Sequence, residues 1–290
     1  MKGIILAGGS GTRLAPMTKA FSKHLLPVYD KPMLYYPLSI LMLLGIREIH
    51  MIATSHDKPL YEELFGDGSH LGISIQYVIQ DKPNGIAEAF LLTYDDLKGS
   101  KVCMMLGDNI FYIPNHKEFF ADIVKMQSGA YIFGYQVSDP ERYGVVEVDG
   151  NGKALSIEEK PLNPKSNIAV PGMYFYDEKV FEYAKNLKPS DRGELEITDI
   201  NNIYLSNKEL NVKVLGRSSI WLDSGTSDAL LESSHLIQSI EKRHATKIAC
   251  LEEIAVNMGF VDKKTMKKWV ESTKSKSSYM QYLKNLASNW

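Results

Sequence analysis

Cysteine is scarce in this sequence of 290 residues, and long apolar runs are absent. Its two cysteines, Cys103 and Cys250, lie far apart, which argues against a disulfide scaffold and suits a reducing cytoplasm. No run reaches the roughly 18 apolar residues of a membrane-spanning helix. The first apolar run meets Gly8 and Gly9 too early for a signal peptide. We therefore expect a cytoplasmic protein that does not enter a membrane, with Cys103 as an inert core thiol.

A large excess of positive or negative charge is also lacking. The formal net charge is -2, and no block of like charges occurs before the lysine pairs near the C-terminus. This balance argues against a nucleic-acid groove as the main surface. The histidines show neither H-x-x-H nor cysteine-containing spacing, so a zinc site is not expected. Apolar residues make up 44% and charged residues 23%, which is typical of a chain with a large packed core.

Short apolar runs alternate with helical patterns through the first half of the chain. Strand–helix alternation at this spacing indicates βαβ units in a mostly parallel sheet, with ligands at the carboxyl ends of the strands. The expected strands are 3–7, 48–53, 73–80 and 101–108, and the expected helices are 32–45, 59–68 and 85–97.

The pattern changes in the second half. The predicted elements are a hairpin over 144–161, a strand and helix over 171–187, a helix over 197–207, strands at 211–216 and 219–226, and helices from Ser227 to the end. The sequence therefore predicts an α/β fold with a Rossmann-like, mostly parallel sheet flanked by helices. Its core covers 1–226, and a helical C-terminal appendage of the same domain covers 227–290.

The stretch "GGSGTRL", from Gly8 to Leu14, follows the first predicted strand. A strand, a glycine loop and a helix form a common phosphate site, because backbone N–H groups and the helix N-terminus attract anions. A Walker A loop is excluded, since Gly11 is followed by Thr12 and Arg13, and Leu14 breaks the Rossmann fingerprint. A plain strand-to-helix turn with a surface arginine remains the alternative on the loop alone.

Further motifs occur in order along the whole chain. Together with the opening signature "LAGGSGTRLAPMT…SKHLLPVYDKPM", they resemble the sugar nucleotidyltransferases, and more closely the bacterial glucose-1-phosphate thymidylyltransferases. The motifs are "YYPLS" at 35–39, "LGDN" at 106–109, "DPERYGVVE" at 139–147, "SIEEKP" at 156–161, "PKSN" at 164–167, "GELEITD" at 193–199 and "WLDSGT" at 221–226.

The resemblance implies a glycosyltransferase-A-like nucleotidyltransferase fold, with a nucleotide half over about 1–110 and a sugar-phosphate half over about 111–226. It implies that dTTP and glucose 1-phosphate give dTDP-glucose and pyrophosphate, the first step toward dTDP-rhamnose and other deoxysugars. The sugar phosphate is already an anionic nucleophile, so catalysis is expected from positioning and charge neutralisation rather than from a general base.

The resemblance also implies the roles of individual residues. The expected catalytic residues are Arg13, Lys23, Asp108 and Asp223, the two aspartates being ligands of Mg²⁺. The nucleotide is expected to meet Gly8, Gly9, Gly11, Thr12, Arg13, Lys23, Gln80, Gly85 and Asp108. The sugar phosphate is expected to meet Tyr143, Gly144, Glu159, Lys160 and Val170.

Some alternatives stay open at this point. The same fold could serve UTP or CTP instead of dTTP, or a catalytically inactive relative with a regulatory or scaffold role. Lys23 and the acidic hairpin end at 158–160 could be solvated, and each aspartate could cap a loop. Departures from the family pattern lie at His24, at 82–89 and at 111–116. The last of these lies where the family forms a second site for a feedback nucleotide sugar. A homo-oligomer, a dimer of dimers, is also expected by resemblance.

Overall fold

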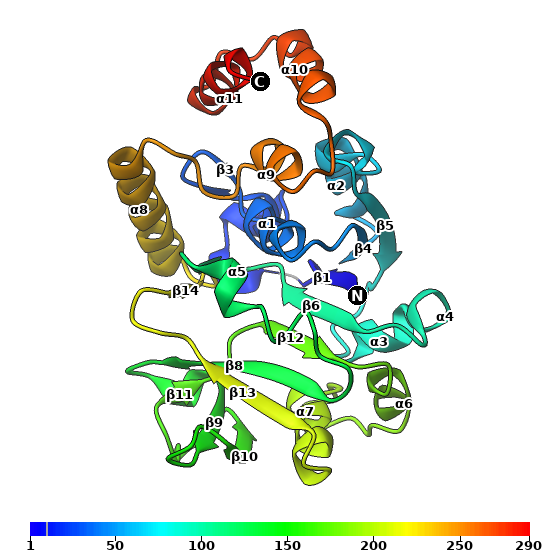
Figure 1. The fold of residues 1–290 in the computed structure, drawn as a ribbon. Coiled ribbons are helices and arrows are strands. Elements are labelled where there is room, and N and C mark those ends of the chain that lie inside the picture. The colour runs from blue at the N-terminus through cyan, green and yellow to red at the C-terminus, as the bar shows by residue number, and fades with distance from the viewer. Residues whose placement is uncertain (10) are drawn as a thin grey trace.

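The computed structural model describes residues 1–9 and 11–290, and a single ten-stranded sheet forms its centre. The strands run in the order β10-β9-β11-β8-β12-β6-β1-β4-β5, and β13 pairs with β8 off this path (Figure 1). The strands are β1 (Lys2–Leu6), β4 (Glu48–Ala53), β5 (Ser74–Ile79), β6 (Val102–Leu106), β8 (Ala130–Gln136), β9 (Gly144–Val148), β10 (Ala154–Glu159), β11 (Ile168–Ala169), β12 (Met173–Tyr176) and β13 (Leu210–Val214).

Strand direction divides the sheet into two parts. β1, β4, β5 and β6 pair in parallel, whereas β12 joins β6 and β8 antiparallel and β9, β10 and β11 continue antiparallel. Two short sheets lie beside the main one, β2 (Pro27–Val28) with β3 (Lys31–Pro32), and β7 (Asn109–Tyr112) with β14 (Ile220–Asp223). The predicted α/β sheet is confirmed, and its antiparallel pairs are formed with strands that follow β6 in the chain.

Helices cover both faces of the sheet. Ile5 of β1 belongs to the apolar cluster beneath α1 and α9 (Leu251–Asn257), and its neighbour Ile4 belongs to the cluster beneath α3, α6 and α7. This division follows from the alternation of side chains along a strand. The helices are α1 (Tyr35–Leu43), α2 (Lys58–Phe65), α3 (Glu88–Leu92), α4 (Tyr94–Leu97), α5 (His116–Phe119), α6 (Val180–Lys185) and α7 (Ile197–Ser206).

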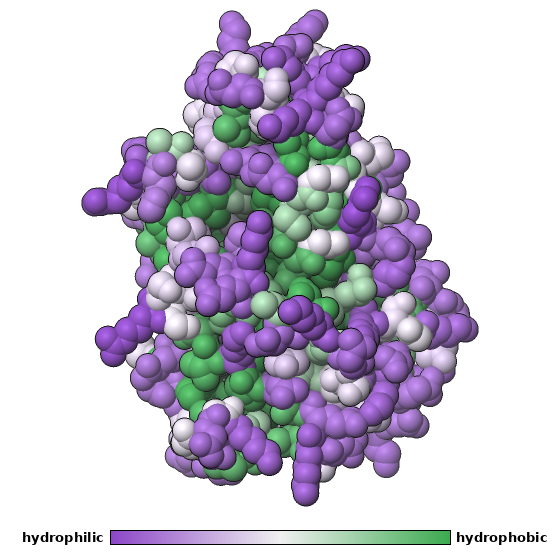
Figure 2. Space-filling model, viewed as in Figure 1, coloured by the Kyte–Doolittle hydropathy of each residue, from purple (hydrophilic) through white to green (hydrophobic). Residues whose placement is uncertain are grey.

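The chain after residue 226 is helical, as expected. Figure 1 shows α8 along one side of the molecule and α10 and α11 stacked above α9, at the end opposite β9 and β10. Hydrophilic side chains cover the outside of α10 and α11 in Figure 2. The four helices are α8 (Ser227–His244), α9 (Leu251–Asn257), α10 (Lys263–Ser272) and α11 (Ser278–Ser288).

Two further expectations concern the cysteines and membranes. Cys103 and Cys250 are both buried and both free, so the prediction of a core thiol at Cys103 is confirmed. Among the residues that the structure describes, no helix combines the length and the apolar character that a membrane crossing needs.

Candidate functional site

The glycine loop follows β1 and bends sharply. Gly9 and Gly11 have φ values of 110° and 58°, which only glycine adopts readily. A Cβ on Gly11 would lie 2.9 Å from Cγ2 of Thr18 and 3.3 Å from Cβ of Lys23. The loop is therefore packed directly against the segment that carries Lys23, before η1 (Thr12–Leu14) begins.

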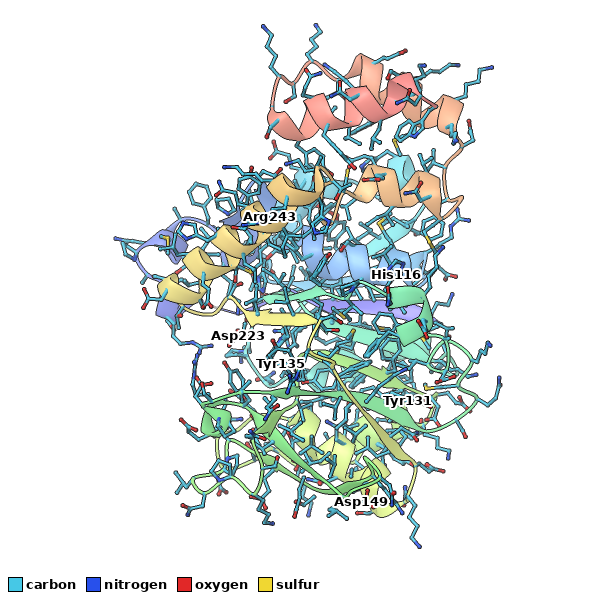
Figure 3. The ribbon with its side chains drawn as sticks, turned by 60° about the vertical axis from the view of Figure 1, so that its left-hand side comes forward. His116, Tyr131, Tyr135, Asp149, Asp223 and Arg243 are labelled. Atoms are coloured by element: carbon cyan, nitrogen blue, oxygen red, sulfur yellow. The ribbon has the colours of Figure 1, made fainter. Side chains whose placement is uncertain are left out.

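Two aspartates meet beside this loop. Asp108 follows β6 in the turn to β7, and Asp223 ends β14 in register with Asn109 of β7. The N–H of Ser224 donates to the Asp108 carbonyl at 3.2 Å. Figure 3 shows Asp223 where β14 ends below α8. The sequence placed both aspartates at strand ends, and the pairing of β7 with β14 brings these ends together.

Two cationic side chains face the aspartates. Lys23, at the start of η3 (Lys23–Leu25), holds its Nζ 2.5 Å from Oδ2 of Asp108. Arg13 lies near Asp223, since its Nη2 is 3.3 Å from the position of a Cβ on Gly225. All four expected catalytic side chains therefore lie close together and alternate in charge.

Burial and these neighbours shift the acidities in the site. Burial favours the neutral acid at Asp108, but the Lys23 ammonium and the hydrogen bonds from Lys23 and Asn109 act together against it and lower the pKa of Asp108 to about 2. Burial and the Asp108 carboxylate raise the pKa of Asp223, although Arg13 and Lys23 oppose the rise. Burial and Lys23 lower the pKa of His24 to about 3, so its imidazole is neutral at physiological pH. The site is thus built for fixed charges rather than for proton transfer at neutral pH.

A cavity of about 230 Å³ opens onto these charges. It is lined by Arg13, Asp108 and Asp223, and by all five residues expected at the sugar phosphate: Tyr143, Gly144, Glu159, Lys160 and Val170.

Strand pairing explains how the sugar-phosphate residues meet. Gly144 begins β9 opposite Glu159 of β10, and the Val170 N–H donates to the Gly144 carbonyl at 2.8 Å. Thr198 of α7 donates to Oε2 of Glu159 at 2.7 Å, and Lys160 lies 3.8 Å from Oε1. The neighbouring Glu158 pairs instead with Lys165, away from the cavity, as the alternation of the strand predicts.

The nucleotide residues surround two further cavities. One of about 160 Å³ is lined by Gly8, Gly9, Gln80 and Gly85, and one of about 350 Å³ is lined by Gly9, Lys23 and Gln80 among others. Gly11 and Thr12 line neither of these cavities nor the sugar-phosphate cavity. Gly11 and Thr12 lie instead where the glycine loop bends into η1.

The side-chain amide of Gln80 has a fixed orientation. Its Nε2 donates to the carboxylate of Glu88 at 2.6 Å, and a carboxylate can only accept, so the amide nitrogen must face Glu88. The amide oxygen lies instead on the side of Gly8, 3.5 Å from the position of a Cβ there.

Sequence reasoning missed two arginines at the sugar-phosphate cavity. Arg142 lines it and pairs with Asp139 at 2.6 Å, and Arg192 lies 3.7 Å from Oε1 of Glu159 while it pairs with Glu196. Both stand in charged loops, "PERY" and "DRGE", where arginines are ordinarily solvated. Only the fold shows that Arg142 lines the cavity and that Arg192 lies beside its residue Glu159.

Comparisons with known proteins agree on one family. The family model described as nucleotidyl transferase matches residues 2–240. A glucose-1-phosphate thymidylyltransferase of Neisseria gonorrhoeae is 51% identical over 286 residues, covering 99% of each chain. One of Mycobacterium tuberculosis is 49% identical over 288 residues, again covering 99% of each chain.

A solved structure gives the same result. A Bacillus anthracis protein assigned as a glucose-1-phosphate thymidylyltransferase, crystallised with sucrose, is 43% identical with a TM-score of 0.76. The match covers 81% of this chain and 94% of that chain. A UDP-glucose pyrophosphorylase with 23% identity and a TM-score of 0.73 shares the fold.

Proposed function

The chain belongs to the nucleotidyl transferase family and groups with its glucose-1-phosphate thymidylyltransferases, and we propose that it makes dTDP-glucose and pyrophosphate from dTTP and glucose 1-phosphate. The resemblance drawn from the motifs is thereby confirmed. The observation that carries the proposal is one cavity in which Arg13, Lys160, Asp108 and Asp223 meet beside the glycine loop. Such a set of charges suits two phosphate groups that must approach each other.

In an in-line transfer, each of these residues would have a different role. An oxygen of the sugar phosphate forms a bond to the α-phosphorus, and the bond to the bridging oxygen of the β-phosphate breaks. The electron pair leaves with pyrophosphate, whose growing charge Arg13 is placed to neutralise. Lys160 and Glu159 hold the sugar phosphate by its charge and its hydroxyls, and Lys23 stands at the transferring group.

Magnesium fits the pair Asp108 and Asp223. Two carboxylates of like charge are held together with little solvent, and burial and Asp108 raise the pKa of Asp223 for that reason. Mg²⁺ prefers oxygen ligands and typically takes one or two carboxylates besides phosphate and water. The described part of the chain contains no larger group, of three or more His, Cys, Asp or Glu residues, that is suited to a metal, so phosphate and water would have to supply the other ligands. When bound, the ion would neutralise charge at the reacting phosphates.

The orientation of Gln80 supports a thymine or uracil base over cytosine. Its amide oxygen, turned toward the cavity side at Gly8, can accept the N3–H that thymine and uracil carry. Cytosine has an acceptor at N3 and would meet this oxygen unfavourably. A UTP-dependent reaction therefore remains the second candidate.

We also propose a second nucleotide-sugar site for feedback control. Figure 2 shows apolar residues in a hollow between α8, α9 and α5, where a cavity of about 270 Å³ is lined by Tyr112, His116, Lys247 and Glu253 among others. Nε2 of His116 is buried there without a partner among the described residues. Lys247 is itself paired with Asp30 and Glu241, so the proposal rests on the resemblance and on the unpartnered His116 nitrogen.

The remaining proposals rest on the resemblance. The protein would work in the cytoplasm as a dimer of dimers, and its product would feed the synthesis of dTDP-rhamnose or another deoxysugar.

Measuring pyrophosphate and sugar nucleotide with dTTP, UTP and CTP in turn, each with glucose 1-phosphate, tests the proposal. Both products should appear only when magnesium, the triphosphate and the sugar phosphate are all present, and dTTP should give the highest kcat/KM. Comparable hydrolysis of dTTP without sugar phosphate would refute transfer. No reaction with any triphosphate would favour an inactive relative.

A further inference from the structure

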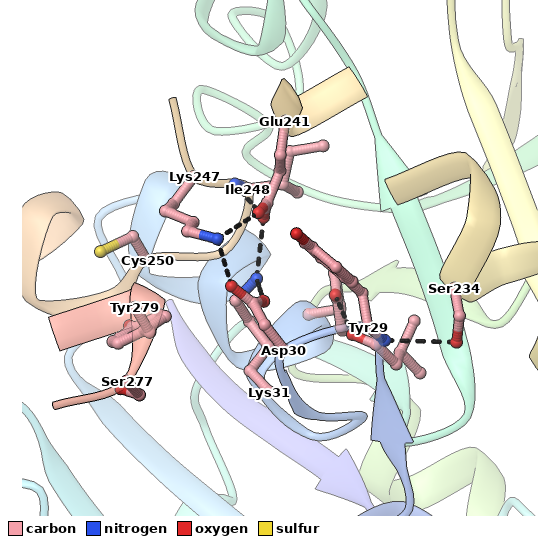
Figure 4. Close-up of polar contacts among 12 residues, drawn as sticks. Tyr29, Asp30, Lys31, Ser234, Glu241, Lys247, Ile248, Cys250, Ser277 and Tyr279 are labelled. Atoms are coloured by element: carbon pink, nitrogen blue, oxygen red, sulfur yellow. Dashed lines mark hydrogen bonds and ion pairs between the residues drawn. The ribbon is translucent and has the colours of Figure 1, made fainter. Parts of the chain in front are cut away.

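Four charged side chains outside the site form a closed ring of alternating charge, which we call the charge ring (Figure 4). Nζ of Lys31 lies 2.5 Å from Oδ1 of Asp30 and 2.9 Å from Oε1 of Glu241. Nζ of Lys247 pairs with the same two acids, at 2.7 Å from Oε2 of Glu241. The side chains of Lys31 and Glu241 are only 2% and 3% exposed. Burial of this kind is costly unless every charge has a counter-charge close by, and each of these four has two.

The charge ring joins three segments that are distant in sequence. Asp30 lies in the turn between β2 and β3, and Lys31 begins β3. Glu241 lies in the last turn of α8, and Lys247 lies in the connection from α8 to α9. The N–H of Ile248 also donates to Oε1 of Glu241, at 2.9 Å. The ring therefore fastens the β2–β3 hairpin to the C-terminal helices.

That hairpin carries Lys23 at its entry. The N–H of Leu26 donates to the Lys23 carbonyl at 3.1 Å, closing the η3 turn. Directly after β3, the N–H groups of Met33 and Leu34 donate to the carbonyls of Leu26 and His24, both at 3.1 Å. Because these bonds tie the end of the hairpin to η3, a shift at Lys31 is passed to the backbone of Lys23.

The opposite end of α8 holds Asp223. Thr226 caps the helix by accepting from the N–H of Ala229, and the hydroxyls of Ser224 and Ser233 lie 3.0 Å apart. Figure 3 shows Asp223 near one end of α8 and Arg243 near the other. The 18 residues of α8 span about 27 Å. One rigid helix thus connects the loop of Asp223 with the hairpin of Lys23.

We propose that the charge ring sets the position of Lys23 against Asp108 and Asp223, which makes Asp30, Lys31, Glu241 and Lys247 positioning residues for the transfer reaction. An apolar contact would let the hairpin slide, whereas four alternating charges hold it in one register. A displacement of about 1 Å at a reacting group can cost on the order of a hundredfold in rate. The inference rests on the proposed function.

A double-mutant cycle tests whether the ring acts through Lys23. Glu241→Gln keeps the shape of the side chain, and Lys247→Met removes the less buried cation. Each change should lower kcat about tenfold in the wild-type background and by less than about twofold in a Lys23→Ala background, because the group being positioned is then gone. Lys179→Met, which breaks a pair with Glu209 far from the ring, is the matched control and should leave kcat unchanged.

A fall in kcat of equal size in both backgrounds would show a general loss of folded protein and would overturn the proposal. So would an unchanged kcat in both ring variants. Glu241→Gln keeps the cycle decisive if Lys247→Met does not fold.

Amide hydrogen exchange tests the same proposal without relying on turnover. In the ring variants, the amides of Leu26, Met33 and Leu34 should exchange faster than in the wild type, while those of β1 keep their rates. Unchanged exchange at the three amides would overturn the inference even if the enzyme is active. A wild type that is inactive with dTTP and glucose 1-phosphate would refute the proposed function, and the exchange rates would still decide whether the ring holds the hairpin.

Discussion

Replacing Gly85 by alanine should damage both the fold and the nucleotide cavity. Gly85 has a φ of 108°, and a Cβ there would lie 2.4 Å from both the N and the O of Leu195. Both atoms belong to backbone groups that already form hydrogen bonds. The N–H of Leu195 donates to the Asn84 carbonyl at 2.7 Å, and the Leu195 carbonyl accepts from Ala87 at 3.1 Å. No flexible side chain can retreat from the added methyl group, so the backbone must move.

The cost follows from two contributions. A non-glycine residue held in this region of φ costs about 1–3 kcal/mol, and overpacking against rigid neighbours costs about 1–3 kcal/mol more. A middle estimate is therefore about 4 kcal/mol of unfolding free energy. At about 2–4 °C per kcal/mol for a large domain, Tm should fall by about 10 °C.

Thermal unfolding and steady-state kinetics on Gly85→Ala and Gly99→Ala provide the assay. Gly99 is the matched control, because its φ of 79° carries the same kind of strain while a Cβ there meets nothing within 4 Å. Gly85→Ala should lose clearly more stability than the control, and its KM for dTTP should rise, since Gly85 and Gln80 line the same cavity. Equal changes in Tm for the two variants, with an unchanged KM, would refute the reasoning.

The other predictions concern the charged side chains and assembly. Lys23→Ala should lower kcat by about a hundredfold or more, whereas Lys160→Ala should mainly raise the KM for glucose 1-phosphate; equal effects on sugar affinity would contradict this division. Asp108→Asn and Asp223→Asn should each keep the fold, lower turnover about a hundredfold or more, and need more Mg²⁺ for half-maximal rate; near-native activity with an unchanged magnesium optimum would exclude that aspartate as a ligand. Burial and Asp108 raise the pKa of Asp223 above the ordinary 3.8. Asp223 must be ionised to bind Mg²⁺. Activity should therefore fall as the pH drops through that raised pKa, and added Mg²⁺ should move the fall to lower pH. A pH profile that stays the same at all Mg²⁺ concentrations would argue against a metal at Asp223. Light scattering should show an oligomer, and a particle of 32.6 kDa at micromolar concentration would refute it.

The sequence was most informative where structure is local. The parallel strands of the first half are flanked by their own helices and turns, so alternation along the chain is enough to predict them. β8 was not predicted, because its interior contains Gly134 and its strand character comes from pairing with β11, β12 and β13. The helix expected over 85–97 is divided into α3 and α4 at Thr93, whose hydroxyl donates to the Ala89 carbonyl.

The same distinction explains which site residues could be predicted. Gly11, Lys23 and Asp108 belong to short motifs, because a tight loop and a strand end need particular residues at adjacent positions. Arg142 and Arg192 do not belong to a local motif of this kind. Their position relative to the cavity depends on how distant strands and loops come together.

The charge ring is the extreme case of this dependence. Lys31 and Glu241 are separated by 210 positions, and in the sequence each is an ordinary charged residue in a turn or at the end of a helix. Their burial makes them interdependent, since removing one leaves two like charges with a single counter-charge in a poorly solvated place. The residues that carry out the chemistry are thus specified by local motifs, while the distance between Lys23 and Asp223 depends on pairs that no local pattern reveals. A variant that keeps every motif but loses Glu241 should therefore bind its substrates and transfer the nucleotide slowly.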